Sequence, residues 1–306
     1  MISDLMIAGG VVMKWEIAFD VRNELGEGPV YDDMRDELIW CDILGQKLFI
    51  ASLAGKQTRQ QIHQYHFDEP VSAAFLGRDD TLCIAGASGL YQLDRVSGNR
   101  ILRQPIEADN PATRANDSRT CPGGAIWFGT MGRKLEAGAG AIYHLTRGKN
   151  HIDTQILFPD MSIPNATCFS ADGRVAYFCD TPKQQILSLS IDPETGLPIG
   201  QPSLFVDLAP ENLNPDGAVI DAEGCLWNAQ WGAGRIACYG PDGKFRRAIE
   251  LPASQITCPC FGGTDLKTLF ATSAYEGLDR QKEPLAGAVF AIEMEVAGLP
   301  ERRINL

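Results

Sequence analysis

A pair of short apolar strands recurs six times along the chain, and this repeat constrains the fold more than any other feature. The first strands of the pairs begin at residues 38, 82, 126, 175, 226 and 269, so the intervals are 44, 44, 49, 51 and 43 residues. A period of this length is typical of one four-stranded blade of a β-propeller. The sequence therefore predicts an all-β fold, a six-bladed β-propeller.

The ring of blades must also close. A strand-like run at residues 15–19 precedes the first repeat, and an apolar strand at 288–292 lies near the end of the chain. Pairing the two would place the N-terminal strand in the last blade and remove free sheet edges. We expect residues 1–13 to be a loose extension, residues 14–306 to form a single propeller domain, and residues 209–213 to form at most one helical turn.

Composition excludes several classes of protein. The formal net charge of −12 argues against nucleic acid as a partner, because phosphate binding needs a basic surface. No apolar run approaches the ~20 residues of a membrane span, and the first ten residues do not read as a signal peptide. The nine cysteines lack the spacing of a disulfide framework. We expect free, mostly buried thiols and a cytoplasmic protein, with no obligate protein partner evident.

Polar residues occupy one register in most of the repeats. Counting back 10 to 12 residues from each first strand gives Glu27, Val71, Asn116, Asn165, Asp216, and Thr257 or Cys258. The innermost strand of each propeller blade starts at the mouth of the central channel, so four carboxylate or carboxamide groups would converge there. Taken singly, these residues also suit turns. Together, oxygen ligands of this kind favour one divalent metal ion, Ca²⁺ or Mg²⁺, with Mn²⁺ or Zn²⁺ also accepted.

Motifs for other kinds of catalysis are missing from the sequence. No G-x-S-x-G nucleophile motif, P-loop, dinucleotide-binding glycine motif or HExxH zinc motif is present, and the chain has only four histidines. Metal-assisted chemistry is the class that remains.

Several motifs, in order and correctly spaced from about residue 15 to residue 300, resemble the signatures of the SMP-30/gluconolactonase/regucalcin family. They are Leu25-Gly26-Glu27-Gly28-Pro29 with Leu38-Ile39-Trp40-Cys41-Asp42-Ile43, Arg114-Ala115-Asn116-Asp117 with Phe128-Gly129-Thr130-Met131, Pro164-Asn165 with Ser170-Ala171-Asp172-Gly173, Pro215-Asp216-Gly217 with the run from Asp221 to Trp227, Gly234-Arg235, and Phe261-Gly262-Gly263.

The resemblance implies a six-bladed propeller with a divalent metal bound by Glu27, Asn165 and Asp216. It also implies that Arg114 and Asn116 hold a sugar-like substrate above the ion, and that the chain hydrolyses lactones of aldonic acids. A metal ion in an open channel would polarise a lactone carbonyl and activate water. Asp216 is the candidate general base, because a carboxylate beside the ion would take a proton from the attacking water.

The chain departs from the family pattern after Met131. Some regucalcins carry an acidic substrate contact at the place that Lys134 occupies here, with Glu136 nearby, which would favour a substrate with an acidic group. The segment 132–140 would act either as a lid or as an ordinary surface loop.

Three other functions stay open. The first is a calcium-binding, regucalcin-like regulatory protein without turnover, although no EF-hand loop is present. The second is a propeller hydrolase acting on other esters or on organophosphates, as relatives of this fold do. The third is a propeller scaffold that binds another protein.

Overall fold

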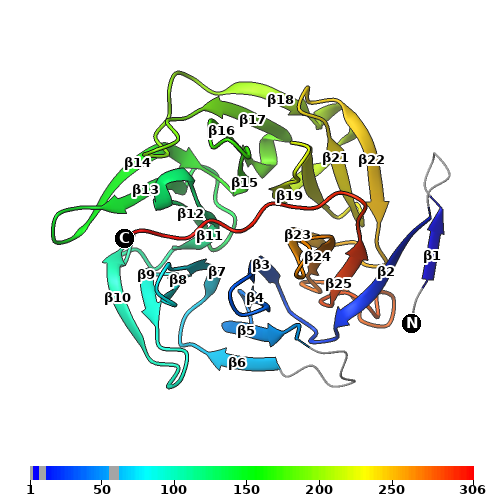
Figure 1. Cartoon of the computed structure of the whole chain (residues 1–306), viewed down its shortest axis with the longest axis horizontal. Helices are drawn as coiled ribbons and strands as arrows, with labels where there is room; N and C mark the ends of the chain where they lie inside the picture. Colours follow the sequence, from blue (N-terminus) through cyan, green and yellow to red (C-terminus); the bar gives the residue numbers. More distant parts are fainter. Residues whose placement is uncertain (1–2, 7–11, 55–61) are drawn as a thin grey trace.

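The computed structural model describes residues 3–6, 12–54 and 62–306, and it folds into six antiparallel sheets arranged in a ring (Figure 1). Every one of the twelve strands expected from the repeat is present. The six-bladed propeller predicted from the sequence is therefore confirmed.

The first five blades each consist of four strands that are consecutive in the chain. Blade 1 is β3 (Gly26–Asp32), β4 (Glu37–Asp42), β5 (Lys47–Ser52) and β6 (Ile62–His66). Blade 2 is β7 (Val71–Leu76), β8 (Leu82–Gly86), β9 (Gly89–Leu93) and β10 (Arg100–Pro105). Blade 3 is β11 (Thr113–Thr120), β12 (Ile126–Gly132), β13 (Gly140–Arg147) and β14 (Ile152–Met161). Blade 4 is β15 (Pro164–Phe169), β16 (Val175–Asp180), β17 (Gln185–Ser190) and β18 (Ser203–Asp207). Blade 5 is β19 (Asn214–Ile220), β20 (Leu226–Trp231), β21 (Arg235–Tyr239) and β22 (Phe245–Glu250).

Blade 6 joins the two ends of the chain. Its strands are β23 (Ile256–Gly262), β24 (Thr268–Ser273), β25 (Val289–Glu293), β2 (Val12–Phe19) and β1 (Ser3–Met6). β2 pairs antiparallel with β25, with Trp15 opposite Ile292, which confirms the expected closure. Part of the extension expected at residues 1–13 lies outside the described residues. Within them, β1 pairs with β2 as a fifth strand, and the looseness of the segment stays a prediction.

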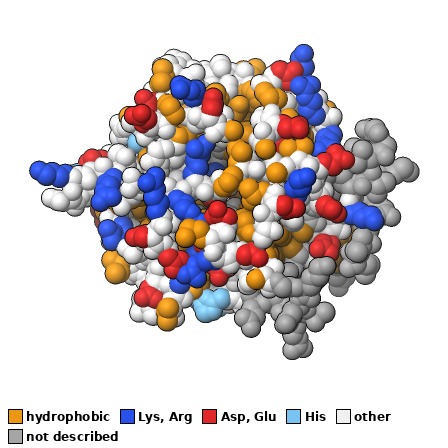
Figure 2. Space-filling model, viewed as in Figure 1, with side chains coloured by type: hydrophobic (Ala, Val, Ile, Leu, Met, Phe, Trp, Pro, Cys, Tyr) orange, Lys and Arg blue, Asp and Glu red, His pale blue; other side chains and the backbone are white. Residues whose placement is uncertain are grey.

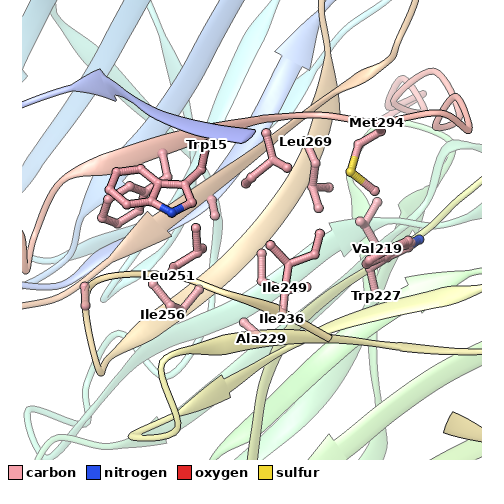
Figure 3. Packing of buried hydrophobic residues seen from close by; sticks show 14 of the residues in the cluster. Trp15, Val219, Trp227, Ala229, Ile236, Ile249, Leu251, Ile256, Leu269 and Met294 are labelled. Atoms are coloured by element: carbon pink, nitrogen blue, oxygen red, sulfur yellow. The ribbon is translucent and has the colours of Figure 1, made fainter. Parts of the chain in front are cut away.

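Hydrophobic packing between adjacent blades holds the ring together. Figure 3 shows the cluster between blades 5 and 6, which includes Trp15 of β2. Trp15 meets Phe290 of β25 edge to face, with ring centroids 5.8 Å apart. Trp227 and Ile256 join the same cluster from β20 and β23. Full burial of each such side chain contributes roughly 1.5–3 kcal/mol. The N-terminal strand thus closes the ring through side chains as well as through its backbone ladder.

The innermost strands β3, β7, β11, β15, β19 and β23 each contact the next around the ring, and β23 contacts β3. They surround the central channel. Three 3-10 turns, Pro122–Gly124, Thr181–Lys183 and Ala209–Glu211, are the helical elements of the described residues, and the last matches the single turn expected at 209–213. No described helix is long and apolar enough to cross a membrane.

The segment that follows β25 crosses one face of the ring (Figure 1). Along the way Gly298 bridges Asp221, and Ile304 bridges Gly77. These contacts lie at the C-terminal ends of the inner strands β19 and β7. Figure 2 shows this face, with Lys and Arg side chains gathered on the side of β9 and β13. The channel is thus covered at the end opposite to the starts of the inner strands.

All nine cysteines lie among the described residues and all are free. Eight are buried and Cys225 is partly exposed. Burial raises the pKa of the buried thiols, such as Cys83 and Cys121, both to about 12. The expectation of unpaired, mostly buried thiols is confirmed.

Candidate metal centre and active site

The four polar residues predicted to converge all lie at β-bulges near the starts of inner strands. The ladder register shifts between Glu27 and Val30 in β3, between Ala115 and Ser118 in β11, between Asn165 and Cys168 in β15, and between Pro215 and Ala218 in β19. A bulge inserts an extra residue and re-aims the side chains beside it. Asn116, Asn165 and Asp216 therefore lie in strands, not in the turns that their residue types also allow.

Two of these bulges contain a residue with a left-handed backbone conformation. Gly28, after Glu27, has φ +55°, and Ala166, after Asn165, has φ +56°. A side chain on Gly28 would place its Cβ 2.4 Å from the Ser72 carbonyl oxygen, so glycine is required there. Ala166 adopts the left-handed region despite its Cβ, which is the kind of local strain that clusters at functional sites.

Two carboxyl groups from different blades meet in the channel. Glu27 of blade 1 and Asp216 of blade 5 lie within hydrogen-bonding reach of one another. Burial, together with the nearby charge of Asp117, raises the pKa of Glu27 to about 8, and burial and Glu27 raise the pKa of Asp216 well above its usual range. Carboxylates crowded in this way either share protons or hold a cation.

An amide network joins blades 3, 4 and 5 at the same place. The Asn116 Nδ2 donates to Asn165 Oδ1 at 3.1 Å and to the Pro164 carbonyl at 2.9 Å. The Asn165 Nδ2 donates to Thr181 Oγ1 at 2.9 Å, which in turn donates to the Pro215 carbonyl at 2.8 Å. These bonds fix the Asn165 amide so that its oxygen lies on the side of Asn116.

Arg114 brings a buried positive charge to this group. Its Nη1 donates to Asn116 Oδ1 and to the Ala115 carbonyl, both at 2.8 Å. Burial lowers the pKa of Arg114 to about 10, against the opposing charges of Glu27 and Glu276. The structure thus brings Arg114, Asn116, Asn165, Glu27 and Asp216 together.

Lys134 stands apart from this network. It is exposed in the turn between β12 and β13, where its backbone N–H donates to Glu136 Oε2 at 2.9 Å. No side-chain hydrogen bond or ion pair within the described part of the chain joins Lys134 to the other site residues. Its substrate-binding role, and a lid role for segment 132–140, stay predictions.

Sequence reasoning missed two residues close to the site, one in the channel and one behind the inner strand β19. Asp117 is partly buried, its Oδ2 accepts a bond from the Thr167 backbone N–H at 2.8 Å, and burial raises its pKa. Asn228, fully buried in β20, donates to the carbonyls of Asp216 and Gly217 at 2.9 and 3.2 Å and so holds the bulge of β19. Asp117 follows Asn116 directly in the sequence, but only the bulge reveals that both enter the channel.

The donor set suits a hard divalent cation. Glu27 and Asp216 supply two carboxylates, and among the described residues no third His, Cys, Asp or Glu completes a metal-binding group with them. The Asn165 amide oxygen is the further donor within reach of the same network. Oxygen donors alone are what Ca²⁺ and Mg²⁺ prefer. The residues present therefore fit the ion expected from the sequence.

Comparison with known proteins agrees with the fold. The model of the SMP-30/Gluconolactonase/LRE-like region matches residues 25–275. The 6-deoxy-6-sulfogluconolactonase of Pseudomonas putida is 33% identical over 284 residues, which cover 90% of this chain and 94% of that protein. The L-arabinolactonase of Azospirillum brasilense is 32% identical over 290 residues, which cover 93% of each.

A solved structure extends the comparison to three dimensions. The crystal structure of regucalcin, a calcium-binding protein from Agrobacterium tumefaciens str. C58, superimposes with a TM-score of 0.89 at 38% sequence identity. The superposition covers 95% of this chain and 97% of that one.

Proposed function

The chain belongs to the SMP-30/gluconolactonase/LRE-like family, and from this premise we propose that it hydrolyses a sugar lactone to the aldonic acid with the help of one divalent metal ion. Glu27, Asn165 and Asp216 would hold the ion. The observation that carries the proposal is the meeting of the Glu27 and Asp216 carboxyl groups, from blades 1 and 5, beside the buried charge of Arg114.

Each protein group has a defined task in this reaction. A bound divalent ion would supply positive charge that polarises the lactone carbonyl and acidifies water. The Asp216 carboxylate accepts a proton as the water oxygen attacks the carbonyl carbon. That proton then goes to the ring oxygen as the carbon–oxygen ester bond breaks, which yields the hydroxy acid.

Arg114 is placed to stabilise negative charge. Its Nη1 is engaged by Asn116 and the Ala115 carbonyl, whereas its Nε and Nη2 donate no hydrogen bond within the described residues. A fixed cation beside the developing oxyanion lowers the barrier without reorganisation during the reaction. Asn116 bonds both Arg114 and Asn165, so it sets the substrate-binding group relative to the metal-binding group.

A second function has a specific observation in its favour. The Agrobacterium tumefaciens relative is described as a calcium-binding protein, and the same three residues here would hold calcium without turnover. The two functions share the ion and differ in the use of Arg114 and Asp216.

Turnover on a panel of lactones separates the two functions. The chelator-stripped protein would be assayed for acid release from gluconolactone, arabinolactone and 6-deoxy-6-sulfogluconolactone, with Ca²⁺, Mg²⁺, Mn²⁺ or Zn²⁺ restored. We expect metal-dependent hydrolysis of at least one lactone. We also expect Asp216→Asn to lower kcat at least about 100-fold, as loss of a general base does, while Asp172→Asn, in an exposed turn, leaves it unchanged. Calcium binding without hydrolysis of any lactone would support the regulatory function instead.

We also infer a cytoplasmic location. Its support is the set of nine free cysteines, since free thiols are kept reduced in that compartment.

A further inference from the structure

Two buried aspartates occupy the same structural position in blades 1 and 4. Asp42 is the last residue of β4 and Asp180 is the last residue of β16, and they are 3% and 4% exposed. Asp42 lies opposite Gly26 and Asp180 lies opposite Pro164. Each aspartate therefore pairs with the residue immediately before a proposed metal ligand.

In blade 1, the Asp42 carboxylate holds the chain that leads to Glu27. Its Oδ2 accepts the backbone N–H of Glu24 at 3.1 Å, and its Oδ1 accepts that of Leu25 at 3.0 Å and that of Gly45 at 3.0 Å. Glu24 and Leu25 are the third and second residues before the proposed ligand Glu27.

In blade 4, Asp180 makes the equivalent bonds before Asn165. Its Oδ1 accepts the backbone N–H of Ser162 at 3.1 Å and that of Ile163 at 2.9 Å. These are again the third and second residues before the ligand. The next residue, Thr181, donates its N–H to the Ile163 carbonyl at 3.0 Å, as Ile43 does to the Leu25 carbonyl at 2.9 Å in blade 1.

We propose that Asp42 and Asp180 are positioning residues that hold Glu27 and Asn165 in metal-binding geometry, an inference that rests on the proposed metal site. Each ligand is fixed on both sides. The aspartate binds the two amides before it, and the left-handed residue, Gly28 or Ala166, sets the chain direction after it. Groups that orient metal ligands in this way typically change metal affinity 10–100-fold when removed.

The third ligand is held by a different device. Gln230 lies opposite Pro215, the position that the aspartates have in the other two blades. Its side chain bonds Tyr239 and Arg235 instead of the backbone before Asp216. Asn228 holds the Asp216 carbonyl. The paired aspartates are thus a feature of the Glu27 and Asn165 blades.

The two aspartates should respond differently to asparagine. Both carboxylate oxygens of Asp42 accept backbone N–H groups. In Asp42→Asn the side-chain NH2 group would replace one of these oxygens and face a backbone N–H, so at least one of the hydrogen bonds would be lost. Asp180 takes both amides on Oδ1, so Asp180→Asn keeps both bonds through its remaining oxygen. Asp180→Ala removes them.

Calorimetric titration of the chelator-stripped full chain with Ca²⁺ and, separately, Zn²⁺ tests this proposal. We expect Asp42→Ala, Asp42→Asn and Asp180→Ala to bind the ion about 10–100-fold more weakly than the wild type, and Asp180→Asn to bind it within about threefold. The matched control is Asp221→Ala. Asp221 is another buried aspartate that caps a turn, through the Glu223 and Cys225 amides, but at the opposite end of the channel. Its removal should lower the melting temperature and leave ion affinity unchanged.

Gly45→Ala provides a second variant should Asp42→Ala not fold. An added Cβ at Gly45 would lie 2.3 Å from Asp42 Oδ2 and 2.6 Å from its Cγ. This substitution displaces the carboxylate without removing it, and we expect weakened ion binding here too. Wild-type affinity in Gly45→Ala and Asp180→Ala, or equal weakening in Asp221→Ala, would overturn the proposal while leaving the metal site intact. A wild-type chain that binds neither ion would overturn the proposed function as well.

Discussion

Glu27 shows how burial changes the chemistry of a single side chain. Surrounding protein and the charge of Asp117 raise its pKa to about 8 in the metal-free chain, from an ordinary value of 4.5. The proton on Glu27 therefore stabilises the metal-free fold fully below about pH 4.5, and this contribution is lost as the pH rises through about 8. A cation that takes the place of the proton reverses this dependence.

This linkage predicts that ion binding releases a proton near neutral pH. The apparent affinity for Ca²⁺ should rise as the pH is raised toward about 8, by up to about tenfold per pH unit for each proton displaced. Titration calorimetry in buffers of different ionisation enthalpy measures the number of protons released. An affinity that stays constant between about pH 6 and 8, with no proton release, would contradict a protonated Glu27 in the metal-free site.

The sequence predicted which residues enter the channel better than it predicted their contacts. Glu27, Asn116, Asn165 and Asp216 share a register that the repeat makes visible. Asp117 was missed because strand alternation sends neighbouring side chains to opposite faces, and only the bulge between Ala115 and Ser118 breaks that alternation.

At the scale of elements, the segment after β25 contributes a buried ion pair at the covered end of the channel. Arg119 of β11 donates to Glu301 Oε2 at 2.5 Å and to the Ala218 carbonyl at 3.2 Å. Both charged side chains are mostly buried, at 15% and 11% exposed. A buried cation that loses its partner is strongly destabilising, so this contact ties the segment to the inner strands.

We therefore expect Glu301→Gln to lower the free energy of unfolding by about 2 kcal/mol, through loss of a charged hydrogen bond. Urea unfolding of the metal-free protein measures this change. Glu295→Gln is the matched control, because it removes the same charge from an exposed position on the same segment. Equal midpoints for the two variants would show that the Arg119 pair contributes nothing to stability.

The crossing of this segment could not be predicted from its sequence. Residues 294–306 have no strand periodicity. The residues that they contact, Asp221, Gly77 and Gly124, belong to three different blades, 5, 2 and 3. In contrast, the closure by β2 was predictable. The apolar run near the start of the chain lacks a partner strand and the last blade lacks a strand, so pairing the two removes both unpaired sheet edges.

The whole molecule is a ring of similar blades with one asymmetric site. Its repeat period and apolar strands were enough to predict the architecture, since each blade buries its faces against its neighbours. The ring gives six equivalent positions at the channel mouth. Blades 2 and 6 place Val71, Thr257 and Cys258 in this register, all buried, so the proposed metal ligands come from blades 1, 4 and 5.

We propose that one divalent ion is held in the channel of the ring by Glu27, Asn165 and Asp216. Anomalous diffraction from crystals of the full chain grown with Mn²⁺ tests it most directly. We expect one strong anomalous peak at the mouth of the channel, within about 2.0–2.6 Å of oxygens of all three residues, and its loss in Asp216→Asn. A peak elsewhere, or none in the channel at saturating Mn²⁺, would contradict it.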